Sequence, residues 1–156
     1  MFADAYRGKR VFVTGHTGFK GSWLCLWLER LGAQVTGYSL APPTSPSLFE
    51  QAGIAGAIDH QIGDVRDAAA LSAALAKAQP DFVFHLAAQP LVIESYAAPA
   101  ETFATNVTGS INLLEAVRTS GMRGAVVMVT TDKVYLNREW KLLGDLWQSG
   151  AAPWAR

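Results

Sequence analysis

The chain has 156 residues, and 50% of them are apolar, which is enough for the core of one domain of ordinary size. Its 13 basic and 13 acidic side chains leave a formal net charge of zero, and this balance argues against a nucleic-acid partner, which needs a basic surface. Apolar runs are too short to span a membrane, and residues 1–10 lack the apolar region of a signal peptide. The single cysteine, Cys25, excludes an internal disulfide, and we expect a soluble cytoplasmic protein.

The first predicted elements are a strand over residues 11–14 and a helix over residues 22–31, which ends before Gly32. Three glycines, spaced G-x-x-G-x-x-G, separate them. At such a turn, glycines permit a tight bend, a close approach of phosphate to the backbone, and close packing of helix on strand. The free N–H groups of the following helix favour an anion. We therefore expect a dinucleotide to bind through Gly15, His16, Thr17, Gly18, Phe19, Lys20 and Gly21.

Two readings stay open at this turn. The glycines could form a structural turn without a ligand. Lys20 opposes the helix dipole, so it is either a solvated side chain or a cation retained beside a bound anion.

The rest of the chain alternates between strands and helices. Strands are predicted over residues 34–38, 57–62, 81–86 and 125–129, helices over 68–78 and 99–120, a helical turn over 47–52, and a loop over the proline-rich segment 41–46. This pattern predicts an α/β fold with a Rossmann-type doubly wound parallel sheet of strand order 3-2-1-4-5. Ligands of such sheets bind beyond the carboxyl ends of the strands.

Further candidate residues follow the later strands. Ser39 could bind a ribose, but with no Asp, Glu or Arg there the choice between NAD and NADP stays open. Asp64 could accept from an adenine amino group or could cap the next helix, and His85 is expected to be a satisfied core histidine. Small side chains after the fourth strand would let a cofactor lie close. The predicted cofactor set is completed by Ser39, Asp64, Val65, Leu86, Ala87, Ala88, Gln89 and Thr105.

The predicted reaction centre is the segment after the fifth strand. It places a hydroxyl, a carboxyl and an ammonium together in Thr131, Asp132 and Lys133. Groups of this kind suit proton transfer to and from a substrate. The alternative is an Asp–Lys turn pair without a function.

These motifs together resemble the extended short-chain dehydrogenase/reductase superfamily and, within it, the CDP-glucose 4,6-dehydratases. The resemblance covers residues 7–140. It rests on VTGHTGFKGSW at 13–23, GYSLAPPT at 37–44, PSLFE at 46–50, FHLAAQPLV at 84–92, TTDKVY at 130–135 and NREW at 137–140. The Phe-Lys-Gly and Thr-Asp-Lys segments are much more specific than the glycine pattern of the superfamily.

The resemblance implies an activity on a nucleotide sugar, with no metal. The family converts CDP-glucose to CDP-4-keto-6-deoxyglucose with NAD as an internal hydride shuttle: C4 is oxidised, water leaves across C5 and C6, and hydride returns to C6. By position, Thr131 would hydrogen-bond the sugar and Asp132 would protonate the departing hydroxyl. Lys133 stands where related dehydratases have a glutamate base.

The chain departs from the family pattern in two places. Ile93 stands where the family usually has an arginine, which affects one substrate or structural contact. The superfamily's Tyr-x-x-x-Lys pair, which takes the C4 hydroxyl proton and holds the ribose, occurs nowhere in this sequence; Tyr135 has Glu139 at the lysine's spacing. We therefore expect little or no turnover by this chain alone.

The likeness stops at Trp140. We expect residues 1–140 to form an NAD(P)-binding domain and residues 141–156 an atypical tail, with the substrate domain missing through truncation, for example by a frameshift near codon 140. Trp140, Leu143 and Trp147 share one helical face and, with Trp154, could shield the edge strand or join chains into a homo-oligomer. A frayed tail is the alternative.

Two further functions compete with a dehydratase. One is a dinucleotide-binding module without catalysis. The other is a sugar-nucleotide 4-epimerase, against which the Thr-Asp-Lys segment argues because epimerisation needs no acid for an elimination.

Overall fold

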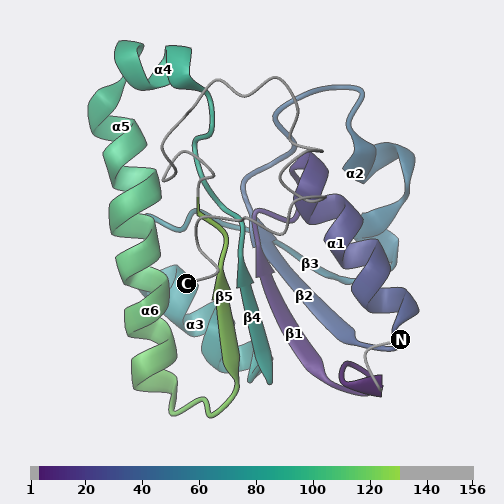
Figure 1. Cartoon of the computed structure of the whole chain (residues 1–156). Helices are drawn as coiled ribbons and strands as arrows, with labels where there is room; N and C mark the ends of the chain where they lie inside the picture. The colour runs from purple at the N-terminus through teal and green to yellow at the C-terminus, as the bar shows by residue number, and fades with distance from the viewer. Residues whose placement is uncertain (1–3, 131–156) are drawn as a thin grey trace, which may run out of the picture.

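The computed structural model describes residues 4–130 and shows a five-stranded parallel sheet of order β3-β2-β1-β4-β5 (Figure 1). This order confirms the predicted fold. The strands are β1 (Arg10–Thr14), β2 (Gln34–Ser39), β3 (Asp59–Ile62), β4 (Phe82–His85) and β5 (Ala125–Met128). Within the described residues, β3 and β5 are the edges of the sheet.

Helices cover both faces of the sheet, as the doubly wound pattern predicts (Figure 1). On one side lie α1 (Phe19–Arg30), α2 (Leu48–Gln51) and the 3-10 turn η2 (Ile54–Gly56). On the other lie α3 (Ala68–Ala78) and the run formed by α5 (Pro99–Phe103), the π-helical segment η3 (Ala104–Thr108) and α6 (Gly109–Ser120); the short helix α4 (Val92–Ala97) precedes this run.

Alternate residues of β1 supply two separate cores. Val11 and Val13 face α1, where the core includes Cys25 and Leu28. Phe12 faces the opposite layer, in a core with Tyr38, Val65, Leu71, Ala74, Leu75, Val83 and Leu113. Because β1 is covered on both faces, Val11, Phe12 and Val13 are all buried, and for this reason they form a continuous apolar run in the sequence.

Side chains and left-handed residues fix the ends of several helices. The Asp67 carboxylate accepts from the Ala70 N–H and caps α3. Ser47 and Glu50 form a capping box on α2. Gly32 and Gly121 adopt positive φ values of 82° and 70° after α1 and α6, which is the usual glycine stop of a helix.

The main differences from prediction lie at element boundaries and in one long helix. Helix α1 begins at Phe19, not Ser22, and β3 begins at Asp59, not Ala57. The single helix predicted over residues 99–120 contains the π-helical segment η3, and α4 was not predicted. The spacing of apolar residues in the sequence does not reveal one extra residue in a helical turn, so a π-helical segment is not predicted from it.

The long helix also leaves an apolar surface uncovered. Among its apolar residues, Leu113 is buried, whereas the exposed side chains are Phe103, Val107, Ile111 and Leu114.

None of the helices within residues 4–130 combines the length and the apolar character that a membrane crossing requires.

Candidate functional site

The glycine turn joins β1 to α1 at the carboxyl end of the sheet. Gly15 has a φ of 73°, and the Gly18 N–H donates to the Gly15 carbonyl over 3.2 Å. Gly18 is the N-cap of α1 and, within the described chain, no side chain accepts from the first N–H groups of this helix. Uncapped N–H groups and the positive end of the helix dipole make this turn suitable for an anion such as a pyrophosphate.

The three glycines differ in what surrounds them. A Cβ at Gly15 would lie 2.6 Å from the Ala87 nitrogen, and one at Gly21 would lie 2.2 Å from the Gly15 oxygen. A Cβ at Gly18 would have only the Gly15 oxygen nearby, at 3.4 Å. Gly15 and Gly21 therefore permit internal packing, whereas Gly18 leaves open space where a ligand's phosphate could approach, and the turn fits a dinucleotide.

The turn packs against the loop that follows β4. Thr14 Oγ1 accepts from the N–H groups of Leu86 and Ala87, over 3.2 and 3.3 Å. Leu86 and Ala87 are half-buried and Ala88 is exposed. The predicted small-residue segment therefore lies directly beside the glycine turn.

Gln89 is held by the long helix at its π-helical segment. The Asn106 carboxamide accepts from the Gln89 N–H over 2.8 Å and donates to the Gln89 carbonyl over 3.0 Å. The Gln89 side chain donates to Thr102 Oγ1 over 3.1 Å. Thr105, also in η3, is half-buried. The π turn thus places Asn106 where it fixes the loop after β4.

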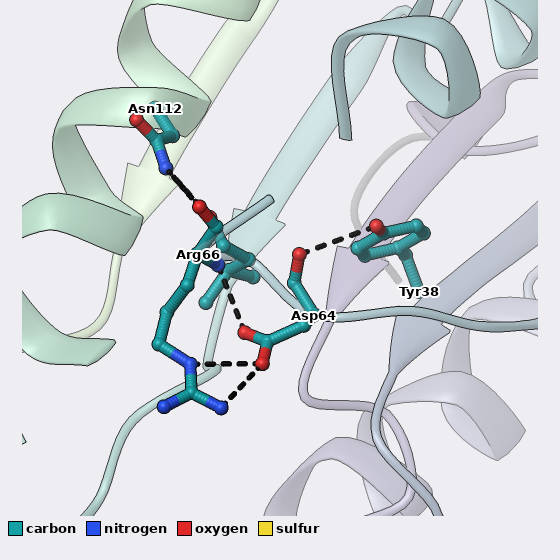
Figure 2. Close-up of polar contacts among 5 residues, drawn as sticks. Tyr38, Asp64, Arg66 and Asn112 are labelled. Carbon is teal, nitrogen blue, oxygen red and sulfur yellow. Dashed lines mark hydrogen bonds and ion pairs between the residues drawn. The ribbon is translucent and has the colours of Figure 1, made fainter. Parts of the chain in front are cut away.

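Asp64 follows β3 and forms an ion pair with Arg66 (Figure 2). Its carboxylate accepts from the Arg66 backbone N–H over 2.9 Å and from Arg66 Nε over 2.8 Å. The side-chain hydrogen bond from Arg66 is the largest of the effects that lower the pKa of Asp64 below its usual value. Asp64 is therefore an ionised acceptor. The cap of α3 is Asp67, which removes the alternative role considered for Asp64.

Two neighbours fix the loop that contains Asp64. Asn112 of α6 donates to the carbonyls of Val65 and Arg66, over 3.0 and 3.1 Å, and Figure 2 shows its amide directed at this loop. Tyr38 donates its hydroxyl proton to the Asp64 carbonyl over 3.3 Å, and burial raises the pKa of Tyr38. Val65 itself is buried in the core.

His16 is buried behind the turn. Its Nε2 lies 2.7 Å from His60 Nδ1, and its ring contacts Phe49 edge-on at a centroid distance of 5.4 Å. Burial, followed by repulsion from His60, lowers the pKa of His16 to about 4, although the Tyr38 carbonyl opposes the shift. Its Nδ1 meets no partner with hydrogen-bond geometry within the described residues. His16 therefore contributes to the site through its backbone and its packing.

The ends of β2 and β4 contain buried hydroxyl and imidazole groups. Ser39 Oγ lies 2.9 Å from Thr17 Oγ1, and both residues are buried. His85 lies between Thr14 Oγ1 at 2.7 Å and Ser110 Oγ at 3.2 Å, and burial lowers its pKa. The prediction of a satisfied core histidine is confirmed.

The remaining predicted residues fall into two groups. Phe19 and Lys20, in the first turn of α1, are exposed. The predicted reaction centre and tail lie outside the described residues: Thr131, Asp132, Lys133, Trp140, Leu143, Trp147 and Trp154. The roles predicted for all site residues stay predictions.

Sequence reasoning missed the polar residues that support the site, namely Arg66, Asn106, Asn112 and His60. The two asparagines gave a usable signal: asparagine disfavours a helix interior, so inside a predicted helix it often has a tertiary partner. Arg66 and His60 gave none, because their partners depend on the folded loop.

Comparison with known proteins supports the family resemblance that the motifs indicate. The CDP-glucose 4,6-dehydratase of Salmonella typhimurium is 56% identical over 135 residues, covering 86% of this chain and 38% of that protein. GDP-mannose 4,6-dehydratase sdnI of Sordaria araneosa is 36% identical, covering 79% of this chain and 22% of that protein. This chain therefore spans well under half the length of these curated relatives.

Solved structures share the fold. UDP-glucose-4-epimerase from Stenotrophomonas maltophila, with bound NAD and formylated UDP-arabinopyranose, matches with a TM-score of 0.74 at 32% identity, covering 85% of this chain and 40% of that one. UDP-glucose 4-epimerase from Brucella ovis, in complex with NAD, matches with a TM-score of 0.70 at 27% identity, covering 82% of this chain and 37% of that one. A model of the NAD dependent epimerase/dehydratase family matches residues 11–139. The resemblance predicted from the motifs is thus confirmed, and the chain belongs to the NAD dependent epimerase/dehydratase family.

Proposed function

We propose that this chain binds NAD and forms the cofactor-binding part of a sugar-nucleotide 4,6-dehydratase that acts on CDP-glucose. The observation that carries the NAD proposal is the uncapped start of α1, with open space at Gly18 between two glycines that cannot hold a Cβ. The substrate proposal is supported by the 56% identity to a CDP-glucose 4,6-dehydratase.

Each part of the described site has a role in this proposal. The N–H groups at the start of α1 bind the pyrophosphate, and Ser39 lies where Rossmann folds contact the adenosine ribose. The ionised Asp64 carboxylate accepts from the adenine amino group, held in place by Arg66 and Asn112. Bound NAD would supply the hydride acceptor and donor for the sugar.

The predicted chemical steps depend on residues beyond Thr130. We propose that Thr131 hydrogen-bonds the sugar, that Asp132 protonates the departing hydroxyl, and that Lys133 takes the position of the base. The sequence holds no Tyr-x-x-x-Lys, and we expect the chain alone to turn over little CDP-glucose. Binding is therefore the direct test of its function, and turnover by the purified chain would contradict this expectation.

The test is a titration of the purified chain with NAD, followed by calorimetry and thermal unfolding. A ligand at about 100 times its Kd adds about 2.7 kcal/mol of stability, which should raise Tm by about 5–10 °C for a domain of this size. The informative variant is Gly18→Ala, because its methyl group would contact only the Gly15 oxygen, at 3.4 Å, and yet would occupy the proposed path of the phosphate.

A matched control comes from Gly56→Ala, whose Cβ would meet no atom within 4 Å and which belongs to η2, outside the glycine turn. We expect Gly18→Ala to lose about 1 kcal/mol of stability at most, from the N-cap change, and to lose most of its NAD affinity. Gly56→Ala should bind NAD as the parent does. Equal NAD binding by both variants would contradict the proposed phosphate site.

A further inference from the structure

The hydroxyl groups of Thr17 and Ser39 form a short directional chain. Thr17 Oγ1 lies 2.9 Å from the Leu40 carbonyl oxygen and 2.9 Å from Ser39 Oγ. A carbonyl can only accept, so Thr17 must donate its single hydroxyl proton to Leu40. Thr17 then accepts from Ser39, and the Ser39 proton is used as well.

This direction leaves Ser39 Oγ with lone pairs alone for any further partner. Thr17 is 4% exposed and Ser39 is 9% exposed, so water has little access to exchange with either hydroxyl. Ser39 ends β2 beside the glycine turn, the place where a Rossmann fold contacts the adenosine ribose. A group that binds here must therefore donate a proton to Ser39.

We propose that the Thr17–Ser39 hydroxyl chain makes this site select NAD against NADP, an inference that rests on the proposed NAD site. The 2′-hydroxyl of NAD can donate to Ser39 Oγ. The 2′-phosphate of NADP is an anionic acceptor, so lone pairs on Ser39 face lone pairs on the phosphate.

The neighbouring sequence offers no cation to offset that repulsion. Residues 37–47 contain neither Lys nor Arg, although an arginine at this point is the usual partner of a 2′-phosphate. Selectivity against NADP usually comes from an acidic residue at the end of the second strand. Here the neutral Ser39 discriminates against NADP, because its hydroxyl proton is already donated to Thr17.

The experiment measures the Kd of NAD, NADP and the 2′-deoxyadenosine analogue of NAD by calorimetry, for the whole chain and three variants. Thr17→Val removes the acceptor for the Ser39 proton, and Ser39→Ala removes the lone pairs. Thr36→Val is the matched control, because Thr36 lies on β2, the strand of Ser39, and its hydroxyl makes only a weak 3.4 Å hydrogen bond to Asp59 of β3.

We expect the parent to bind NAD at least about fivefold more tightly than NADP, since an unpaired polar group costs about 1 kcal/mol or more. In Thr17→Val the freed Ser39 proton can donate to phosphate, so the NADP-to-NAD ratio of Kd should fall several-fold. In Ser39→Ala the 2′-deoxy analogue should bind as NAD does, whereas the parent should distinguish them by about threefold to tenfold.

Ratios of Kd within one variant separate selectivity from general damage to the turn, which would weaken both cofactors alike. Equal binding of NAD and NADP by the parent would overturn the inference alone and leave the NAD site standing. The inference would also be overturned if Thr17→Val and Ser39→Ala both kept the parent's NADP-to-NAD ratio of Kd. Binding of neither cofactor by the parent would overturn the inference together with the proposed function.

Discussion

Acid should destabilise this fold through His16. Its imidazole is buried against Phe49 and His60, and its pKa falls from 6.5 to about 4 on folding, first because burial penalises the charged ring. Below pH 6.5 the unfolded chain therefore binds a proton that the folded chain rejects. The stability that this group contributes is complete above about pH 6.5 and declines as the pH falls toward 4.

The size of the loss follows from the two pKa values. Each unit of difference is worth about 1.36 kcal/mol, so the complete effect is about 3 kcal/mol. By pH 5, where the folded ring is still mostly neutral, about 2 kcal/mol should already be lost. This is a large fraction of the 5–15 kcal/mol that usually stabilises a domain.

Urea unfolding followed by tryptophan fluorescence, at steps from pH 7.5 to pH 5, measures this loss. His16→Gln should show a shallower pH dependence than the parent by about 2 kcal/mol across this range, while His85, whose pKa burial also lowers, leaves a residual slope in both. His60→Gln should retain most of the parental slope, because burial is the first cause of the His16 shift. Parallel curves for the parent and His16→Gln would refute the reasoning.

Three further substitutions test other parts of the structure. Gly37→Ala would place a Cβ 2.5 Å from the buried His16 ring and should cost about 1–3 kcal/mol of stability by urea unfolding; Gly56→Ala is its control. Asn112→Ala should lose about 1–2 kcal/mol and weaken NAD binding in calorimetry, because the loop after β3 loses both hydrogen bonds from this amide. Asp67→Ala removes the N-cap of α3 and should lower stability by about 1 kcal/mol.

The parts of the fold that local chemistry decides could be predicted from the sequence. Apolar runs give the strands other than β3, and glycines at 15, 18 and 21 give a turn whose three positions differ in the space around them. The helix over Ala68–Ala78 was predicted to the residue because alanine and leucine favour helix, whereas its cap, Asp67, was not predicted. Strand order then follows from the handedness of crossovers.

Contacts between distant segments could not be predicted in this way. The place of His16 in the glycine turn could be predicted, but the contact of its ring with His60, 44 residues away along the chain, could not. Asn112 reaches the loop after β3 only because α6 packs beside α3. The π-helical turn in η3 depends on the same tertiary setting, since it lets Asn106 hold Gln89.

The proposed NAD site is ordered by the direction of its hydrogen bonds. At the start of α1 the protein offers N–H donors, and the pyrophosphate offers only acceptors. Toward the adenosine end the protein offers acceptors, the lone pairs of Ser39 and the carboxylate of Asp64, where the ribose hydroxyl and the adenine amino group donate. The sequence shows that hydroxyl and carboxyl groups are present, but it does not show which way the hydroxyls donate. That direction is decided by the Leu40 carbonyl, which accepts from Thr17, so that Thr17 accepts from Ser39. Selection of the cofactor thus depends on how the protein satisfies its own polar groups.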